Sequence, residues 1–147
     1  MENIEYRSMQ KEDIDCIYKL GKENFGSETQ YSWDWSISKI KEYITSSFGT
    51  AFVCVHEDKI VGFALAQNKY SEQKKGLAWF TYIMVSNDFQ SKGIAKKLLS
   101  MVESSLKEKG VKEIITDIYE DNKNSLNFFE KQGFEIKEKW FILAKKI

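Results

Sequence analysis

The sequence has few cysteine and histidine residues, which bind zinc or form Cys–His catalytic pairs. It contains one histidine, His56, and two cysteines, Cys16 and Cys54, without the Cys-x-x-Cys spacing or histidine cluster that a zinc site needs. His56 falls at the expected end of a hairpin, where a lone histidine has no partners to give it a catalytic role. We therefore expect no metal, and two buried, reduced thiols rather than a disulfide.

The chain also lacks an excess charge, a long apolar run and any repeat. Lys+Arg and Asp+Glu each number 22, so the bulk charge gives no reason to expect nucleic acid or a membrane surface as a partner. No apolar run is long enough to span a bilayer, and the N-terminus has no apolar signal core. These features predict a cytoplasmic protein. Its 147 residues, free of linkers and low-complexity tracts, fit a single domain over 1–147.

Helix and strand patterns alternate along most of the chain. Helical spacing of apolar residues covers Ile14–Gly21, Ile37–Ile44, Lys96–Lys109 and Lys123–Gln132. Strand patterns cover Ile4–Arg7, Ala51–Val55, Ile60–Ala66, Leu77–Val85, Glu113–Tyr119 and Phe134–Lys146, the last as one bent strand or two. The aromatic-rich segment from Gly26 to Trp35 and the polar segment from Tyr70 to Gly76 are expected to be loops. An antiparallel N-terminal meander followed by a strand–helix crossover predicts a mixed α+β sheet.

The most informative segment is Gln90-Ser91-Lys92-Gly93-Ile94-Ala95, between the strand ending at Val85 and the following helix. The first N–H groups of a helix have no partner within it and carry partial positive charge, so a phosphate can bind there through main chain alone. Gly93 lets the main chain approach closely. The segment is neither a mononucleotide P-loop nor a Gly-x-Gly-x-x-Gly dinucleotide fingerprint, since its pattern is Gln-x-x-Gly-x-Ala.

This pattern resembles the acetyl-CoA site of the GNAT family of N-acetyltransferases, and a second block agrees with it. Asn122, Ser125, Phe128, Phe129, Glu130, Lys131, Gly133 and Phe134 are similar to the family's Asn-x-x-Ala-x-x-Phe-Tyr-Glu-Lys-x-Gly-Phe segment. The resemblance is specific from about Tyr82 to Phe134 and implies a mostly antiparallel sheet of six to seven strands with about four helices. Proline is absent, so Asn87 stands where the family usually has a proline, and its side chain can form that turn.

The resemblance implies that acetyl-CoA binds along the strand that ends at Val85 and at the helix start. The residues so implied are Ile83, Met84, Val85, Gln90, Ser91, Lys92, Gly93, Ile94, Ala95, Lys96, Asn122, Asn124 and Phe128. Lys92 and Lys96, near the helix start, favour the phosphates, whereas Lys97 is as well explained by a solvated helix face.

The resemblance also implies candidate catalytic residues. Direct attack needs a neutral amine, so a base must take a proton from the ammonium form. Many members of the family keep a glutamate on the strand that corresponds to Leu77–Val85, and this sequence has no acidic residue there. Asp117 occupies the place of a base proposed in one branch of the family, and side-chain alternation along a strand would put it on one face with Tyr119. A strand-end acid facing solvent is the alternative. Phe129 replaces the tyrosine commonly proposed to protonate the leaving thiolate, and its helical spacing fits a core residue.

Acceptor contacts are expected from the aromatic segment after the first helix. Tyr31, Trp33 and Trp35 suit apolar or cationic groups, unless they only fix the loop onto the second helix. The function expected is acetyl-CoA-dependent N-acetylation of a primary amine by direct attack in a ternary complex. Peptide N-termini, lysine side chains and small amines stay open as acceptors, and a homodimer stays open as an assembly. The alternative is an acyl-CoA-binding regulatory module with weak or no catalysis.

Overall fold

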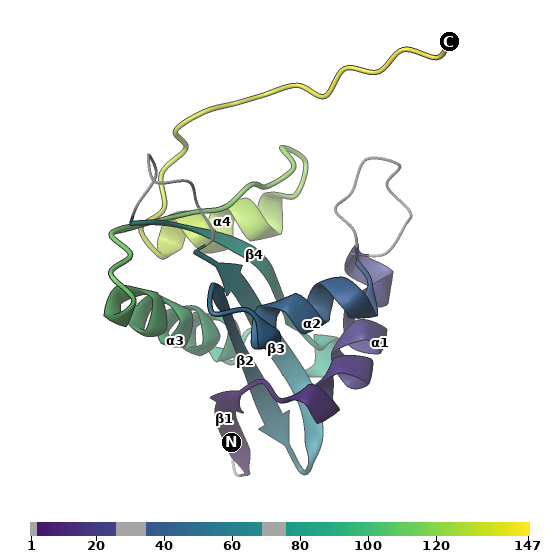
Figure 1. Ribbon diagram of the computed structural model, residues 1–147, viewed down its shortest axis with the longest axis vertical. Helices are drawn as coiled ribbons and strands as arrows, with labels where there is room; N and C mark the ends of the chain where they lie inside the picture. The colour runs from purple at the N-terminus through teal and green to yellow at the C-terminus, as the bar shows by residue number, and fades with distance from the viewer. Residues whose placement is uncertain (1–2, 26–34, 69–75) are drawn as a thin grey trace. The chain divides into compact units, whose positions relative to one another are not determined.

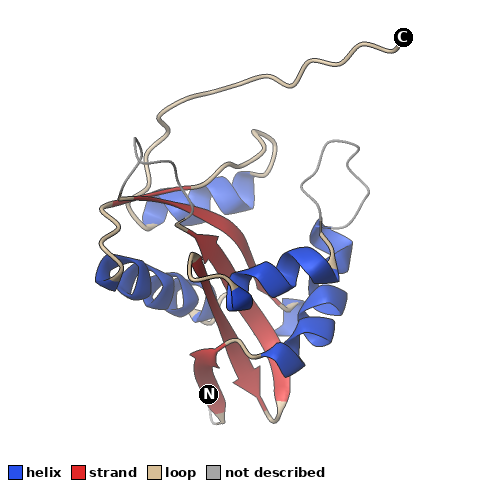
Figure 2. Ribbon diagram, in the orientation of Figure 1, coloured by secondary structure: helices blue, strands red, loops and turns tan. Residues whose placement is uncertain are grey.

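A five-stranded sheet forms the centre of the first of two compact units, Met1–Thr116 and Asp117–Ile147, in a computed structural model that describes residues 3–25, 35–68 and 76–147. The strands are β1 (Ile4–Ser8), β2 (Gly49–His56), β3 (Lys59–Gln67), β4 (Leu77–Val85) and β5 (Glu113–Ile115), in this order across the sheet. β1 to β4 pair antiparallel, and β5 pairs parallel to β4. The mixed, mostly antiparallel sheet of the sequence analysis is thereby confirmed (Figure 2).

Helices cover both faces of this sheet. α1 (Ile14–Phe25) and α2 (Ile37–Thr45) pack with Phe63 in a cluster of buried apolar residues. A side chain at the neighbouring Gly62 would instead meet Ile94 and Leu98 of α3 (Ile94–Glu108). Because neighbouring residues of a strand point to opposite faces, α3 lies on the face opposite α1 and α2 (Figure 1). α4 (Lys123–Lys131) belongs to the second unit.

Trp35 anchors α1 to the sheet. Its ring stacks on Phe63 at 5.7 Å between centroids and meets Tyr82 of β4 edge-on at 4.9 Å. Its indole N–H donates to the carbonyl oxygen of Tyr18 at 3.0 Å. On α1 the ring packs directly against Gly21, where any Cβ would collide with it. Gly21 is therefore required for helix and ring to approach each other.

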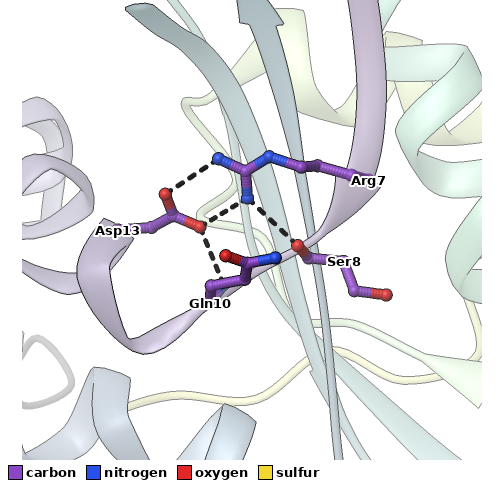
Figure 3. A network of polar contacts seen from close by, with 4 residues as sticks. All are labelled: Arg7, Ser8, Gln10 and Asp13. Atoms are coloured by element: carbon purple, nitrogen blue, oxygen red, sulfur yellow. Dashed lines mark hydrogen bonds and ion pairs between the residues drawn. The ribbon is translucent and has the colours of Figure 1, made fainter. Parts of the chain in front are cut away.

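An ion pair fixes the connection from β1 to α1. The guanidinium of Arg7 donates to both carboxylate oxygens of Asp13, at 2.7 and 3.0 Å, and to the carbonyl of Ser8 (Figure 3). The backbone N–H of Gln10 adds a third bond to this carboxylate at 2.7 Å. Asp13 is 7% exposed. Its hydrogen bonds from Arg7 hold the pKa of Asp13 below its ordinary value, although burial opposes the shift.

Several expectations are wrong or need correction. The segment after Phe134 forms no strand among the described residues, so the sheet has five strands and not six or seven. β5 ends at Ile115 rather than at Tyr119. Cys16 is exposed, and only Cys54 is the buried thiol expected of both. Of the two expected loops, residues 26–34 and 69–75 lie outside the described residues. No described helix is both long and apolar enough to cross a bilayer.

Candidate active site

The second half of β4 does not pair with the neighbouring strand β5. Pairing between these strands covers only Leu77–Trp79 and Glu113–Ile115. On the other side, the register with β3 shifts at Thr81, because Leu65 lies opposite Tyr82 while Ala66 lies opposite Phe80. Such a bulge bends a strand and often ends its pairing. Ile83, Met84 and Val85, expected to contact acetyl-CoA, thus form a stretch whose β5 side has no strand partner within the described residues.

A short loop joins β4 to α3 and is held by the side chain of Gln90. The amide nitrogen Nε2 donates to the carbonyl oxygen of Val85 at 3.0 Å and to Oδ1 of Asn87 at 3.2 Å. The turn begins with the N–H of Ser86 bonded to the carbonyl of Val61 at 2.8 Å. The side-chain amide of Gln90 therefore forms its hydrogen bonds within the protein. This side chain holds the loop, and Asn87 takes part in the turn at the position where the resemblance implies a proline.

The start of α3 presents a row of free backbone donors. Gly93 adopts the left-handed conformation at φ 82° and Ser91 does so at φ 59°. The first bond of the helix runs from the N–H of Lys97 to the carbonyl of Gly93 at 3.0 Å. Among the described residues, none accepts a bond from the N–H groups of the preceding segment, Ser91 to Lys96. This arrangement fits an anion such as a pyrophosphate.

The lysines beside this helix start differ in their placement. The ammonium of Lys92 lies over the ring of Phe89, 5.4 Å from its centroid, and that ring contacts His56 at 5.0 Å. Lys96 is exposed within the first turn of α3, as is Lys97. Ile94 is buried beneath this turn and Ala95 is half-buried, so both contribute main chain rather than side chain to the surface. Positive charge of Lys96 therefore adds to that of the helix terminus.

The remaining predicted cofactor residues belong to the second unit. Asn122 caps α4 by accepting the N–H of Ser125 on its Oδ1 at 3.3 Å. Asn124 is exposed. Phe128 is half-buried and contacts Phe129, whose own ring is 4% exposed and also meets Phe134 at 5.0 Å. The expectation that Phe129 is a core residue agrees with this burial.

The two predicted catalytic residues follow β5 without belonging to it. Asp117 is exposed and Tyr119 is 54% exposed. The argument that both share one strand face is wrong, because the strand ends two residues before Asp117. Both therefore stay predictions that rest on the motif alone.

Of the three aromatic residues expected to contact the acceptor, the structure describes only Trp35. Tyr31 and Trp33 lie outside the described residues. Trp35 is 8% exposed in the core, which favours the alternative that it fixes its segment onto the fold.

A pocket next to β4 was not foreseen from the sequence. It has a volume of about 310 Å³, with α1 contributing Lys19, Leu20, Glu23 and Asn24. Its other wall is Met84, Ser86 and Asn87, and the amide nitrogen of Asn24 contacts the sulfur of Met84 at 3.3 Å. The only signal in the sequence was the spacing of Lys19 and Glu23 on the polar side of α1. No group of three or more His, Cys, Asp or Glu suited to a metal occurs among the described residues.

Comparisons with known proteins agree with this geometry. Residues 14–134 match the model of the acetyltransferase (GNAT) family. No curated protein sequence gives a significant match. Similar solved structures include an aminoglycoside N-acetyltransferase, AAC(6')-Iy, in complex with CoA, which is 21% identical with a TM-score of 0.82 over 99% of this chain and 96% of that one.

Two further structures are similar over most of their length. AAC(6')-Ih from Acinetobacter baumannii is 17% identical, with a TM-score of 0.79 over 99% of each chain. Ard1 from Thermoplasma volcanium is 20% identical, with a TM-score of 0.75 over 92% of this chain and 84% of that one. At these identities the similarity is one of fold.

Proposed function

Since the chain belongs to the acetyltransferase (GNAT) family, whose enzymes use acetyl-CoA as cosubstrate, we propose that it acetylates a primary amine. The amine attacks the thioester directly in a ternary complex, and the thiolate of CoA leaves. The whole chain acts as one catalytic domain in the cytoplasm. The acceptor belongs to the class of peptide N-termini, lysine side chains or small amines.

The start of α3 is the observation that carries this proposal. It combines free N–H donors over Ser91–Lys96, a left-handed Gly93 and no acidic side chain in the first turn of the helix. A pyrophosphate accepts several hydrogen bonds and gains from the helix dipole. The adjoining half of β4, free of β5, supplies main-chain groups for the pantetheine arm. The residues present therefore fit acetyl-CoA.

The acceptor amine must lose a proton before it can attack the thioester, because an alkylamine has a pKa of about 10.4 and is mostly protonated at neutral pH. Asp117 is the candidate base and Tyr119 a candidate donor to the leaving thiolate. Phe129, which has no hydroxyl, leaves that second role to another group. A thiol with a pKa of about 8.5 is already a tolerable leaving group, so transfer does not require a strong acid.

A second candidate function is that of an acyl-CoA-binding regulatory module. Phe129 in place of the family's tyrosine and the absence of an acidic residue from β4 favour it. Both functions share the phosphate site and differ in turnover.

The two functions separate when protein and acetyl-CoA are mixed with a panel of amines and the released thiol is measured. A reaction without amine is the control for thioester hydrolysis, and calorimetry with CoA measures binding independently. Amine-dependent thiol release supports the enzyme. Tight CoA binding without release supports the module, and absence of CoA binding contradicts both.

A further inference from the structure

The pocket between α1 and the end of β4 combines two opposite charges with neutral hydrogen-bonding groups. Lys19 and Glu23 are four residues apart on α1, so their side chains project from the same side of the helix. Neither forms an ion pair with another residue that the structure describes. One ammonium and one carboxylate are thus available to a ligand.

Most of the residues that line the pocket are polar or charged. Leu20 and Met84 provide the apolar part, while the side chains of Asn24, Ser86 and Asn87 offer donors and acceptors. Such a mostly polar lining suits a small polar ligand rather than an apolar one, and about 310 Å³ lies at the small end of the range of small-molecule sites.

The pocket adjoins the proposed acyl-donor site within the same unit. Met84 belongs to the half of β4 that is free of β5, and Ser86 and Asn87 begin the loop that leads to the helix start. The side chain of Gln90 bonds to Oδ1 of Asn87 and to the carbonyl of Val85. One loop therefore forms a wall of the pocket and shapes the phosphate site.

We propose that this pocket binds the acceptor, and that the acceptor is a small zwitterion carrying both an amine and an anionic group, as an amino acid does. The inference rests on the proposed function and narrows its acceptor class. Glu23 accepts hydrogen bonds from the amine end, and Lys19 binds the anionic end. Asn24, Ser86 and Asn87 complete the hydrogen bonds between them.

The charge balance distinguishes this ligand from the other acceptors. A diamine or an aminoglycoside would bring two or more positive charges to a site with one carboxylate, and Lys19 would repel one of them. A lysine side chain of a folded protein would have no anionic group to pair with Lys19. A zwitterion is neutral overall and matches both charges.

The test compares amino acids with their decarboxylated amines, which differ only in the anionic group. Suitable pairs are L-alanine with ethylamine and L-lysine with cadaverine, with neamine and a blocked lysine peptide as further acceptors. Thiol release gives kcat and KM for each. We expect kcat/KM to be at least about tenfold higher for the amino acid of a pair, the size of one charge-assisted hydrogen bond.

Two variants test whether the pocket causes the preference for amino acids over decarboxylated amines. Lys19→Met should raise the KM of amino acids about tenfold, leave that of ethylamine unchanged and lower that of cadaverine, whose second ammonium Lys19 repels, whereas Glu23→Gln should raise KM for amino acids and amines alike. The KM of acetyl-CoA should not change in either. Lys22→Met and Asp15→Asn, at exposed positions of α1 that do not line the pocket, are matched controls and should behave as the wild type.

The outcomes separate this inference from the function on which it rests. Thiol release with equal KM in wild type and Lys19→Met overturns the inference and leaves the acetyltransferase intact. A variant that raises the KM of acetyl-CoA instead assigns the pocket to the donor and also overturns it. If no amine gives thiol release, the proposed function fails. Calorimetry of L-alanine and L-lysine with the CoA-saturated protein then supports the pocket if Lys19→Met abolishes binding, and overturns it if neither amino acid binds.

Discussion

Replacement of Gly93 by alanine tests whether the left-handed conformation at the start of α3 makes the acetyl-CoA site. A Cβ at Gly93 would meet no protein atom within 4 Å, so within the protein itself it is the left-handed conformation, at φ 82°, that favours glycine here. The left-handed region costs a non-glycine residue about 1–2 kcal/mol, and alanine regains roughly 0.4–1 kcal/mol by stiffening the unfolded chain. The net loss of unfolding free energy is about 1 kcal/mol, or about 2–4 °C in Tm.

Gly110, after the end of α3, provides a matched control. It has the same φ of 82° and also no atom within 4 Å of a Cβ. Gly110→Ala should therefore cost the same stability as Gly93→Ala. Only Gly93→Ala disturbs the free N–H donors, and the loss of one good hydrogen bond to a phosphate weakens acetyl-CoA binding about tenfold or more.

Urea unfolding and calorimetry with acetyl-CoA measure the two effects separately. Gly93→Asn should recover part of the stability, since asparagine tolerates the left-handed region better than alanine. The reasoning is refuted if Gly93→Ala and Gly110→Ala bind acetyl-CoA equally well. It is also refuted if Gly93→Ala unfolds at the same urea concentration as the wild type.

Three further predictions follow from buried or exposed side chains. Asp13→Asn should lower the unfolding free energy by about 1–3 kcal/mol at pH 7. Because Arg7 lowers the pKa of Asp13 in the folded state, this difference should be complete above about pH 4 and shrink as pH falls further, which urea midpoints at pH 7 and pH 3 check. Phe129→Tyr should lower Tm without a gain in turnover, since the ring is buried, and a stable variant with turnover raised up to about 10² would contradict this. Asp117→Asn should reduce thiol release by about 10² at neutral pH, with recovery at high pH, if Asp117 is the base.

The parts of the fold that the sequence predicted are those set by local patterns. β4 was expected at Leu77–Val85 and is found there, because apolar and aromatic residues fill it between a turn and a polar loop. α3 follows from apolar residues at helical spacing and from Gly110 beyond its end. The hairpin at Glu57-Asp58 was predicted too, and both residues have positive φ.

The wrong predictions concern contacts with residues elsewhere in the chain, which a local sequence pattern cannot identify. Phe134–Lys146 alternates well enough for a strand, yet a strand exists only where another pairs with it. The prediction that Asp117 and Tyr119 share one strand face assumed in the same way that β5 continues past Ile115. The motif also could not indicate that the side-chain amide of Gln90 donates to Val85 and Asn87, five and three residues away, while cofactor binding by Gln90 stays a prediction.

The packing of Trp35 gives the protein an optical reporter. Its indole is buried against α1, donates to Tyr18 and lies 4.9 Å from the ring of Tyr82, so its emission is that of an apolar site and receives energy from tyrosine. Trp140, at 64% exposed, emits as an indole in water. A variant that keeps Trp35 and carries phenylalanine at the other three tryptophans would follow movements of α1 by fluorescence alone. Since α1 carries Lys19 and Glu23, occupation of the pocket could then be titrated without any reaction.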